Sequence, residues 1–297
     1  MQGLTRDVVY VLRPGDHNEE LRYSLRSLTN LPHRHVWIAG HCPTWVTGLG
    51  HIPTKQIGSK WANSTENLWA AIDHPEVSEE FVLFNDDFFV MTPVDDIPTQ
   101  HRGPVTGVFD EYHRTGRSAS TWCQGMVGII EVLRELGIPD PVSYELHIPM
   151  VLRKDRVREV LSIPLRPSHE AARQSHKRTL YGNYWAIGGE QVPDCKVRHR
   201  SQRMIRDGGP FLSTSDHLFR VSPVGRSIRA QFPEPSPYEV PEKKLPSQRQ
   251  SGAMRTWRHR QDGRVRTVRH GTSADRRYAA WHEWMEEVES DGPALAS

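Results

Sequence analysis

The first clear feature in the pattern of hydrophobic and polar residues is a short apolar run at residues 7–12. Its letters, Asp-Val-Val-Tyr-Val-Leu, are rich in β-branched and aromatic side chains, and the letters Arg-Pro-Gly-Asp follow at 13–16. Apolar runs of this length that stop at a Pro-Gly pair are typical of buried strands. The pattern therefore predicts a strand over 7–12.

Helical periodicity follows that turn. Leu21, Leu25 and Leu28 recur at intervals of four and three residues, which predicts one apolar helix face. The charged positions between them are spaced for the opposite, solvated face, namely Glu19, Glu20, Arg22 and Arg26. We therefore predict an amphipathic helix over 18–31.

Strands and helices continue to alternate up to residue 90. The pattern predicts a second strand over 35–40, a helix over 63–74 with Asn63 or Ser64 as its N-cap, and a strongly apolar strand over 80–90 that three polar residues interrupt. Such alternation is typical of a mostly parallel sheet that helices cover on both faces. The predicted fold class is therefore α/β.

Helical periodicity dominates the middle of the chain, at about 99–175. The apolar spacing predicts helices over 120–136 and 149–161. We therefore expect this part to form a helical insertion beside the sheet.

The composition changes after residue 241. The next stretch is rich in Arg and Gln and poor in aliphatic side chains, and a short helix is predicted over 274–288. We therefore divide the chain into a main domain, 1–241, and a basic C-terminal appendage, 242–297.

Overall composition narrows the class of protein. Of the 297 residues, 36% are hydrophobic and 25% are charged, which excludes collagen-like, fibrous and wholly disordered chains. No run approaches the roughly 18 apolar residues of a membrane span, and the first residues lack the apolar core of a signal peptide. Three widely spaced cysteines, Cys42, Cys123 and Cys195, favour neither a disulfide framework nor a cysteine zinc site. We expect a cytoplasmic protein.

The sharpest candidate for chemistry is the pair Asp86 and Asp87, which apolar residues flank on both sides. Two carboxylates at the end of a buried strand are costly unless another group compensates their charge. Mg²⁺ binds one or two carboxylates together with substrate phosphates, and ligands of open α/β sheets bind beyond the carboxyl ends of the strands. The pair therefore predicts a divalent metal site, with an ordinary solvated turn as the alternative.

Other candidates are individually weaker. Arg22 and Arg26 lie four residues apart, a spacing that suits a phosphate clamp and equally a solvated helix face. His147 precedes a predicted helix and has the chemistry of a general base near neutral pH, although most of the sixteen histidines must serve elsewhere. Asp216 alone is typical of any turn.

Taken in order, these segments resemble the Stealth family of sugar-1-phosphate transferases, which includes bacterial capsule-polymer phosphotransferases and the animal enzyme that tags lysosomal glycoproteins. The family's successive blocks are similar to residues 7–16, 20–28 with 81–89, 147–149, 211–216 and 232–239. The block at 20–28, Glu-Leu-Arg-Tyr-Ser-Leu-Arg-Ser-Leu, is the most specific match. The first block departs from the family because it lacks the usual Trp-Val-Asp.

The resemblance implies a GT-A-like domain that binds a nucleotide-diphosphate sugar. In the implied reaction an acceptor hydroxyl, on a carbohydrate or another molecule, attacks the phosphorus bonded to the sugar, and a nucleoside monophosphate leaves. The resemblance assigns Mg²⁺ or Mn²⁺ to Asp86 and Asp87. It assigns catalysis to His147, Asp216 and Arg22, and substrate binding to Asp16, Arg22, Arg26 and Asn63.

Two alternatives remain open from the sequence. A true glycosyltransferase would use the same carboxylate pair, but its acceptor, a glycan or modified DNA, would attack the anomeric carbon and release a nucleoside diphosphate. The second alternative is a non-enzymatic nucleic-acid binder, because Arg-rich segments such as the C-terminal appendage bind phosphate backbones.

Overall fold

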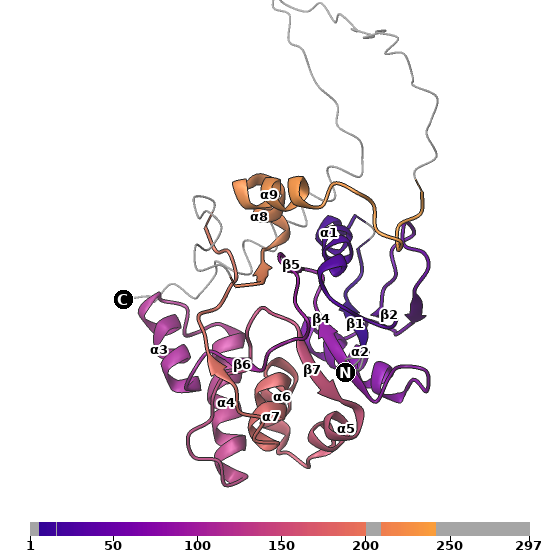
Figure 1. Ribbon diagram of the computed structural model, residues 1–297. Helices are drawn as coiled ribbons and strands as arrows, with labels where there is room; N and C mark the ends of the chain where they lie inside the picture. The colour runs from indigo at the N-terminus through magenta and orange to yellow at the C-terminus, as the bar shows by residue number, and fades with distance from the viewer. Residues whose placement is uncertain (1–5, 16, 200–208, 242–297) are drawn as a thin grey trace, which may run out of the picture. The chain divides into compact units, whose positions relative to one another are not determined.

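The computed structural model describes residues 6–15, 17–199 and 209–241 (Figure 1). Its centre is a five-stranded sheet with the order β3-β2-β1-β4-β7. Its strands are β1 (Asp7–Leu12), β2 (Val36–Gly40), β3 (Gly50–Ile52), β4 (Glu80–Phe84) and β7 (Met150–Arg153). The first four are parallel, and β7 lies antiparallel to β4. The predicted α/β class is confirmed at this level: a mixed, mostly parallel sheet flanked by helices, compatible with a Rossmann-like fold.

Two hydrophobic cores lie on opposite faces of this sheet. Tyr10 packs in the core that includes Leu25 of α1 (Glu19–Ser27), and Val9 packs in the core that includes Leu68 of α2 (Lys60–Asp73). Neighbouring strand residues thus serve opposite faces, as the two-residue period of a strand requires. Because Val9 and Tyr10 are both fully buried, the apolar run of β1 is uninterrupted.

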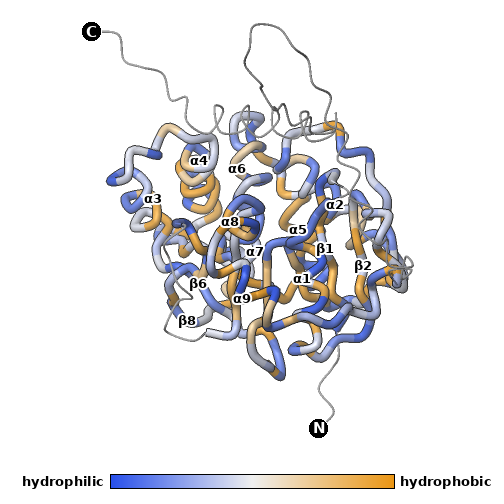
Figure 2. Tube along the Cα trace, turned by 90° about the horizontal axis from the view of Figure 1, so that it is seen from above, coloured by the Kyte–Doolittle hydropathy of each residue, from blue (hydrophilic) through white to orange (hydrophobic). Residues whose placement is uncertain are grey.

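A layer of further helices enlarges the core beside α2. It consists of α3 (Val105–Arg114), α4 (Thr121–Glu135), α5 (Lys154–Ser162), α6 (Glu170–Ser175) and α7 (Lys177–Tyr184). Figure 2 shows hydrophobic positions concentrated along β2 and α4. The helix predicted over 120–136 is confirmed as α4. Two short strands, β6 (Gln100–His101) and β8 (Glu190–Gln191), pair at the border of this layer.

The helix predicted over 149–161 is wrong in its first part. Met150 pairs with Leu83 in β7, and the helix α5 begins only at Lys154. Pairing with the open edge of β4 satisfies the backbone of this segment, and that interaction joins residues far apart in sequence. Helical periodicity carries no information about such pairing.

The strand predicted over 80–90 is two strands. A turn at 85–87 ends β4, and β5 (Phe88–Val90) then pairs with β9 (Phe211–Ser213) in a separate two-stranded sheet. Helices α8 (Asp216–Val221) and α9 (Pro223–Gln231) follow β9. The three polar residues are thus the corner at which the chain leaves the main sheet.

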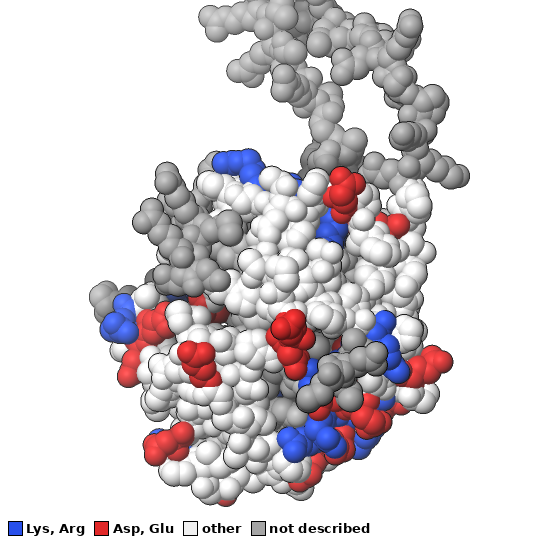
Figure 3. All heavy atoms as spheres, in the orientation of Figure 1, with Lys and Arg blue, Asp and Glu red and all other residues white. Residues whose placement is uncertain are grey.

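The N-cap predicted for α2 is also wrong. Ser59 is the cap: its hydroxyl accepts from the backbone N–H of Ala62 at 3.2 Å, so the helix begins one turn earlier than expected. For the described residues, no helix is long and apolar enough to cross a membrane. On the face shown in Figure 3, basic and acidic side chains of the described chain are interspersed rather than grouped by sign.

The strand order reverses direction between β1 and β4. From β1 the chain continues to β2 and β3 on one side, whereas β4 lies on the other side. Tyr10 is paired with Phe84, so the segments that follow these two strands leave the sheet side by side. A reversal of this kind is where open α/β sheets bind their ligands.

Candidate functional site

The turn at 85–87 follows β4 at this reversal, and all three of its residues are half-buried. Asn18, the N-cap of α1, donates from Nδ2 to Asp86 Oδ2 at 2.6 Å, while its Oδ1 accepts from the Leu21 backbone N–H at 2.9 Å. The residue that starts the helix therefore also positions the carboxylate. Burial, together with the charge of Asp87, raises the pKa of Asp86.

Asp87 has stronger partners. Lys196 Nζ and Ser213 Oγ both donate to its Oδ2, at 3.0 Å and 2.9 Å. Burial favours a higher pKa for Asp87, but the lysine charge and these hydrogen bonds outweigh it and hold the pKa below its ordinary value. Lys196 is placed here because its segment bridges Ser213 of β9, and β9 pairs with β5.

A third carboxyl, that of Glu20, lies beside this pair. The predicted solvated position of Glu20 is wrong, because the residue is 4% exposed and the Thr214 hydroxyl donates to its Oε1 at 2.5 Å. The β5–β9 layer covers this part of α1, a tertiary contact that the helical pattern does not contain. Burial and then the charges of Asp87 and Asp86 raise the pKa of Glu20 well above its ordinary value.

Replacing Glu20 by Gln should therefore stabilise the protein near pH 8. The pKa of Glu20 is higher in the folded protein than in the unfolded chain. Above the pKa of the unfolded chain, ionisation of Glu20 therefore lowers the free energy of unfolding. Below that pKa, Glu20 is protonated in both states and the effect vanishes. We expect Tm at pH 8 to rise on the order of 2–4 °C, the shift that about 1 kcal/mol produces in a domain of this size. The gain should shrink toward pH 4. The exposed Glu76→Gln variant is the control, and a lower Tm for Glu20→Gln at pH 8 would contradict the assignment.

His147 lies in the loop before β7, close enough to Asp87 for the two groups to interact electrostatically. Its Nδ1 is 2.9 Å from Asp194 Oδ2, and its backbone N–H donates to Asp194 Oδ1 at 3.1 Å. The ring meets Phe88 edge-on, with the centroids 6.5 Å apart. Burial and the nearby Lys196 charge lower the pKa of His147, although Asp194 opposes them. We assign the neutral tautomer that donates from Nδ1, which leaves Nε2 as a proton acceptor.

Asp194 is held in its ionised form. Burial opposes its charge, but the hydrogen bond to His147, the charge that His147 carries when protonated at acidic pH, and the charges of Arg102 and Arg198 keep the pKa of Asp194 well below its ordinary range. Arg198 Nη2 donates to Oδ2 at 2.8 Å. A fixed carboxylate on Nδ1 is the arrangement that orients a histidine base.

The backbone on both sides of His147 is fixed by Arg178. Its Nη1 donates to the Leu146 carbonyl at 2.7 Å and its Nη2 to the Ile148 carbonyl at 2.8 Å. The guanidinium thus clamps the loop that carries the histidine, and sequence reasoning gave this arginine no role.

Arg22 and Arg26, which were predicted to contact substrate phosphate, both form ion pairs with Glu239. Arg22 Nη1 is 2.6 Å from Glu239 Oε2, and Arg26 Nε is 2.7 Å from Oε1. The Arg22 guanidinium also lies over the Trp45 ring, 4.4 Å from its centroid. Both arginines thereby fasten the segment at 232–239 to α1, and their predicted contact with substrate phosphate stays a prediction.

Glu239 should accordingly be a stability residue. Hydrogen bonds and charges from Arg26 and Arg22 hold the pKa of Glu239 below its ordinary value, so its contribution is present above the unfolded pKa and is lost as the pH falls through the folded pKa. We expect Glu239→Gln to lower the free energy of unfolding at pH 7 by about 1–3 kcal/mol in urea denaturation. The exposed Glu234→Gln variant is the matched control. Equal stability of Glu239→Gln and the wild type at pH 7 would contradict this role.

The remaining predicted residues lie apart from these contacts or outside the described chain. Asn63 Oδ1 accepts from the Gly58 backbone N–H at 2.7 Å, near the start of α2. Asp216 is the first residue of α8 and pairs with Arg220 at 3.3 Å. Asp16 lies outside the described residues. The substrate roles predicted for these three stay predictions.

The donor set suits a cation that shares its ligands with a substrate. Over the described parts of the chain, no group of three or more His, Cys, Asp or Glu side chains is arranged to hold a metal ion. The hydrogen bonds from Asn18, Lys196 and Ser213 all go to Oδ2 atoms of Asp86 and Asp87. Two carboxylates fit Mg²⁺ when phosphate oxygens and water supply the other ligands.

Comparison with known proteins adds no relative. No model of a known protein family matches the chain, and no curated protein matches it. The resemblance to the Stealth family therefore rests on the sequence blocks given above.

Proposed function

We propose that the protein is a metal-dependent transferase of GT-A-like architecture that moves sugar-1-phosphate from a nucleotide-diphosphate sugar to an acceptor hydroxyl. One observation carries the proposal: two half-buried carboxylates at the reversal between β1 and β4 lie near a histidine whose Nδ1 contacts Asp194. A carboxylate pair for the diphosphate and a base for the hydroxyl are the two parts that such a transfer needs.

The carboxylate side of the site serves the donor. When bound by Asp86 and Asp87, Mg²⁺ or Mn²⁺ supplies positive charge to the diphosphate. Asn18 and Ser213 fix the orientation of the two carboxylates. The Lys196 ammonium, 3.0 Å from Asp87, adds a fixed positive charge at the same edge of the site. Fixed charges placed where negative charge develops account for much of the catalytic effect of enzymes.

The histidine side of the site serves the acceptor. His147 Nε2 accepts the proton of the hydroxyl, and Asp194 stabilises the imidazolium that results. The hydroxyl oxygen forms a bond to the phosphorus that carries the sugar. The bond between that phosphorus and the bridging oxygen breaks, and the nucleoside monophosphate leaves with this oxygen.

The identity of the released nucleotide tests the proposal. The full chain is incubated with a panel of nucleotide sugars, Mn²⁺ and candidate acceptors, and the nucleotides are separated by chromatography. Release of a nucleoside monophosphate is the expected result. Release of a nucleoside diphosphate would instead support the glycosyltransferase alternative, for which the same carboxylates and base serve. The nucleic-acid alternative depends on residues 242–297, which lie outside the described residues.

A further inference from the structure

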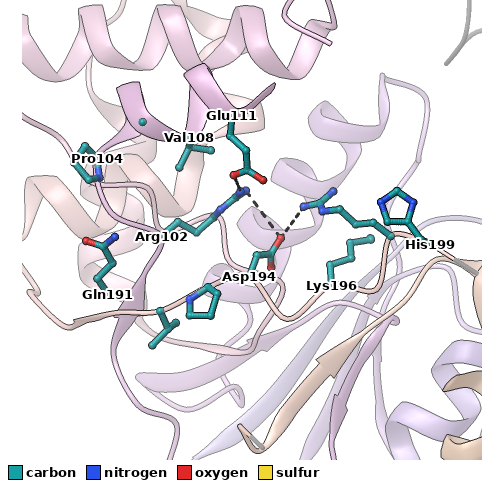
Figure 4. Close-up of a pocket in the computed structure, with 12 residues that line it drawn as sticks. Arg102, Pro104, Val108, Glu111, Gln191, Asp194, Lys196 and His199 are labelled. Atoms are coloured by element: carbon teal, nitrogen blue, oxygen red, sulfur yellow. Dashed lines mark hydrogen bonds and ion pairs between the residues drawn. The ribbon is translucent and has the colours of Figure 1, made fainter. Parts of the chain in front are cut away.

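A cavity of about 530 Å³ adjoins the site, and Asp194 and Lys196 belong to its lining (Figure 4). Helix α3 forms one wall, and the segment 191–199 forms the other. Cavities of this volume are typical of small-molecule sites. Three cationic side chains line it, those of Arg102, Lys196 and Arg198.

The arginines in this cavity compete for one carboxylate. Figure 4 shows the Arg102 side chain extending toward Asp194. Arg198 is within hydrogen-bond distance, at 2.8 Å, whereas Arg102 Nη1 is 4.0 Å from Asp194 Oδ2. At that distance Arg102 Nη1 makes an ion pair with Asp194 but no hydrogen bond.

Arg102 is consequently left with an unpaired buried donor. Its side chain is 5% exposed, and its Nη1 has no hydrogen-bond partner among the described residues. A buried donor without a partner costs free energy, which an acceptor supplied by a ligand would recover. The Arg102 and Arg198 guanidinium carbons lie 5.9 Å and 5.8 Å from the centroid of the Tyr112 ring, within the range of cation–π contacts.

The other partner of Arg102 is easily replaced. Glu111 accepts from Arg102 Nη2 at 3.0 Å, but its side chain is 55% exposed on α3. Ion pairs in which one member is exposed to solvent contribute little to the free energy of folding. An anionic group that entered the cavity would displace Glu111 and could then receive two parallel hydrogen bonds from the guanidinium.

We propose that this cavity binds the acceptor, and that the acceptor carries an anionic group, a phosphate or a carboxylate, which Arg102 and Arg198 recognise. The inference rests on the proposed function, because the cavity reaches the transfer site through two shared residues. Asp194 orients His147, and Lys196 donates to Asp87. An acceptor anchored here by its anion would therefore lie next to the two residues that connect the cavity with the transfer site.

Direct binding tests the inference without donor or metal. The full chain is titrated in a calorimeter with glucose 6-phosphate, glucuronate, glucose and inorganic phosphate. We expect at least one of the two anionic sugars to bind about tenfold more tightly than glucose, since charge-assisted hydrogen bonds are the stronger class. The sugar that binds identifies the anion as phosphate or carboxylate.

Two variants should change this affinity in opposite directions. Arg198→Gln should weaken binding of the anionic sugar by about tenfold. Glu111→Gln should tighten it by up to about fivefold, because the competing carboxylate is gone. Arg114→Gln, an exposed residue of α3 outside the cavity lining, is the matched control and should change nothing. Glu111 is exposed, so its variant keeps the test independent of folding.

Three results would overturn the inference. The first is that neither anionic sugar binds better than glucose, and the second is that Arg198→Gln and Glu111→Gln both leave the affinity unchanged. The third is that inorganic phosphate binds as tightly as the anionic sugar, which would make the cavity a simple anion site. The nucleotide-release assay is separate: anion binding without any nucleotide release would remove the proposed transfer, whereas release without anion binding would remove only this inference.

Discussion

Replacing Asp87 by Asn should lower the turnover of the nucleotide-sugar donor by about 10²–10³-fold, the loss typical of removing one fixed electrostatic group from an active site. Replacing Asp86 by Asn should have a comparable effect, because both carboxylates are needed to hold the cation against the diphosphate. The measurement is nucleotide release at saturating donor and Mn²⁺. Excess chelator should silence the wild type, and added Mn²⁺ should restore it.

The thermal stabilities of these two variants should differ. Asp87 neutralises the half-buried Lys196, so Asp87→Asn should lower Tm at pH 7. Asp86 carries a raised pKa from burial and from Asp87, so Asp86→Asn should leave Tm unchanged or raise it. The exposed Asp95→Asn variant controls for the loss of a negative charge. Activity retained in both Asp86→Asn and Asp87→Asn would remove the metal assignment.

The second large effect is expected at the histidine. Asp194→Asn and His147→Ala should each lower kcat by about 10²–10⁴-fold, because the first removes the group that orients the base and the second removes the base. If the two residues act as one unit, the double variant should be no slower than the slower single variant. Multiplied effects in the double variant would show that they act separately. Asp155→Asn, an exposed aspartate in α5, is the control for fold and charge.

The pH dependence of kcat/KM distinguishes a role of Asp194 in orienting His147 from a purely structural role. The His147 base must be neutral to accept a proton. Burial and then the charge of Lys196 lower the pKa of His147 from the ordinary histidine value of 6.5. On acidification, kcat/KM should therefore fall only below pH 6.5. Asp194 opposes that shift and raises the pKa. Asp194→Asn should therefore move the acidic limb to lower pH while the maximal rate falls. An acidic limb that stays in place would contradict the contact between His147 and Asp194.

The spacing of hydrophobic residues was sufficient to predict the strands and helices whose buried positions repeat with the period of the element. The apolar run at 7–12 predicts β1 because both of its faces are covered, and the leucine spacing predicts α1 because one of its faces packs on the sheet. The carboxylate pair was found for the same reason: Asp86 and Asp87 interrupt an apolar run. A polar break in a buried segment is visible in the sequence itself.

The partners of that pair were decided by tertiary structure alone. Lys196 lies 109 residues from Asp87, and Asp194 lies 47 residues from His147. Each is an ordinary charged residue in its own neighbourhood. Its role appears only when β9 pairs with β5 and brings the 194–198 segment alongside, so no local period could have indicated it.

The sequence by itself thus determined the α/β class, the position of β1 and β4, and the carboxylates that follow β4. Tertiary structure decided that Glu20 is buried, that Met150–Arg153 forms an antiparallel strand and that Arg22 and Arg26 bind Glu239. The physical reason is the range of the interactions. Buried hydrophobic positions repeat with the period of a single helix or strand, so they can be recognised within a short stretch of sequence. The partner of a charged side chain or of a strand edge depends instead on which distant segment the fold brings next to it.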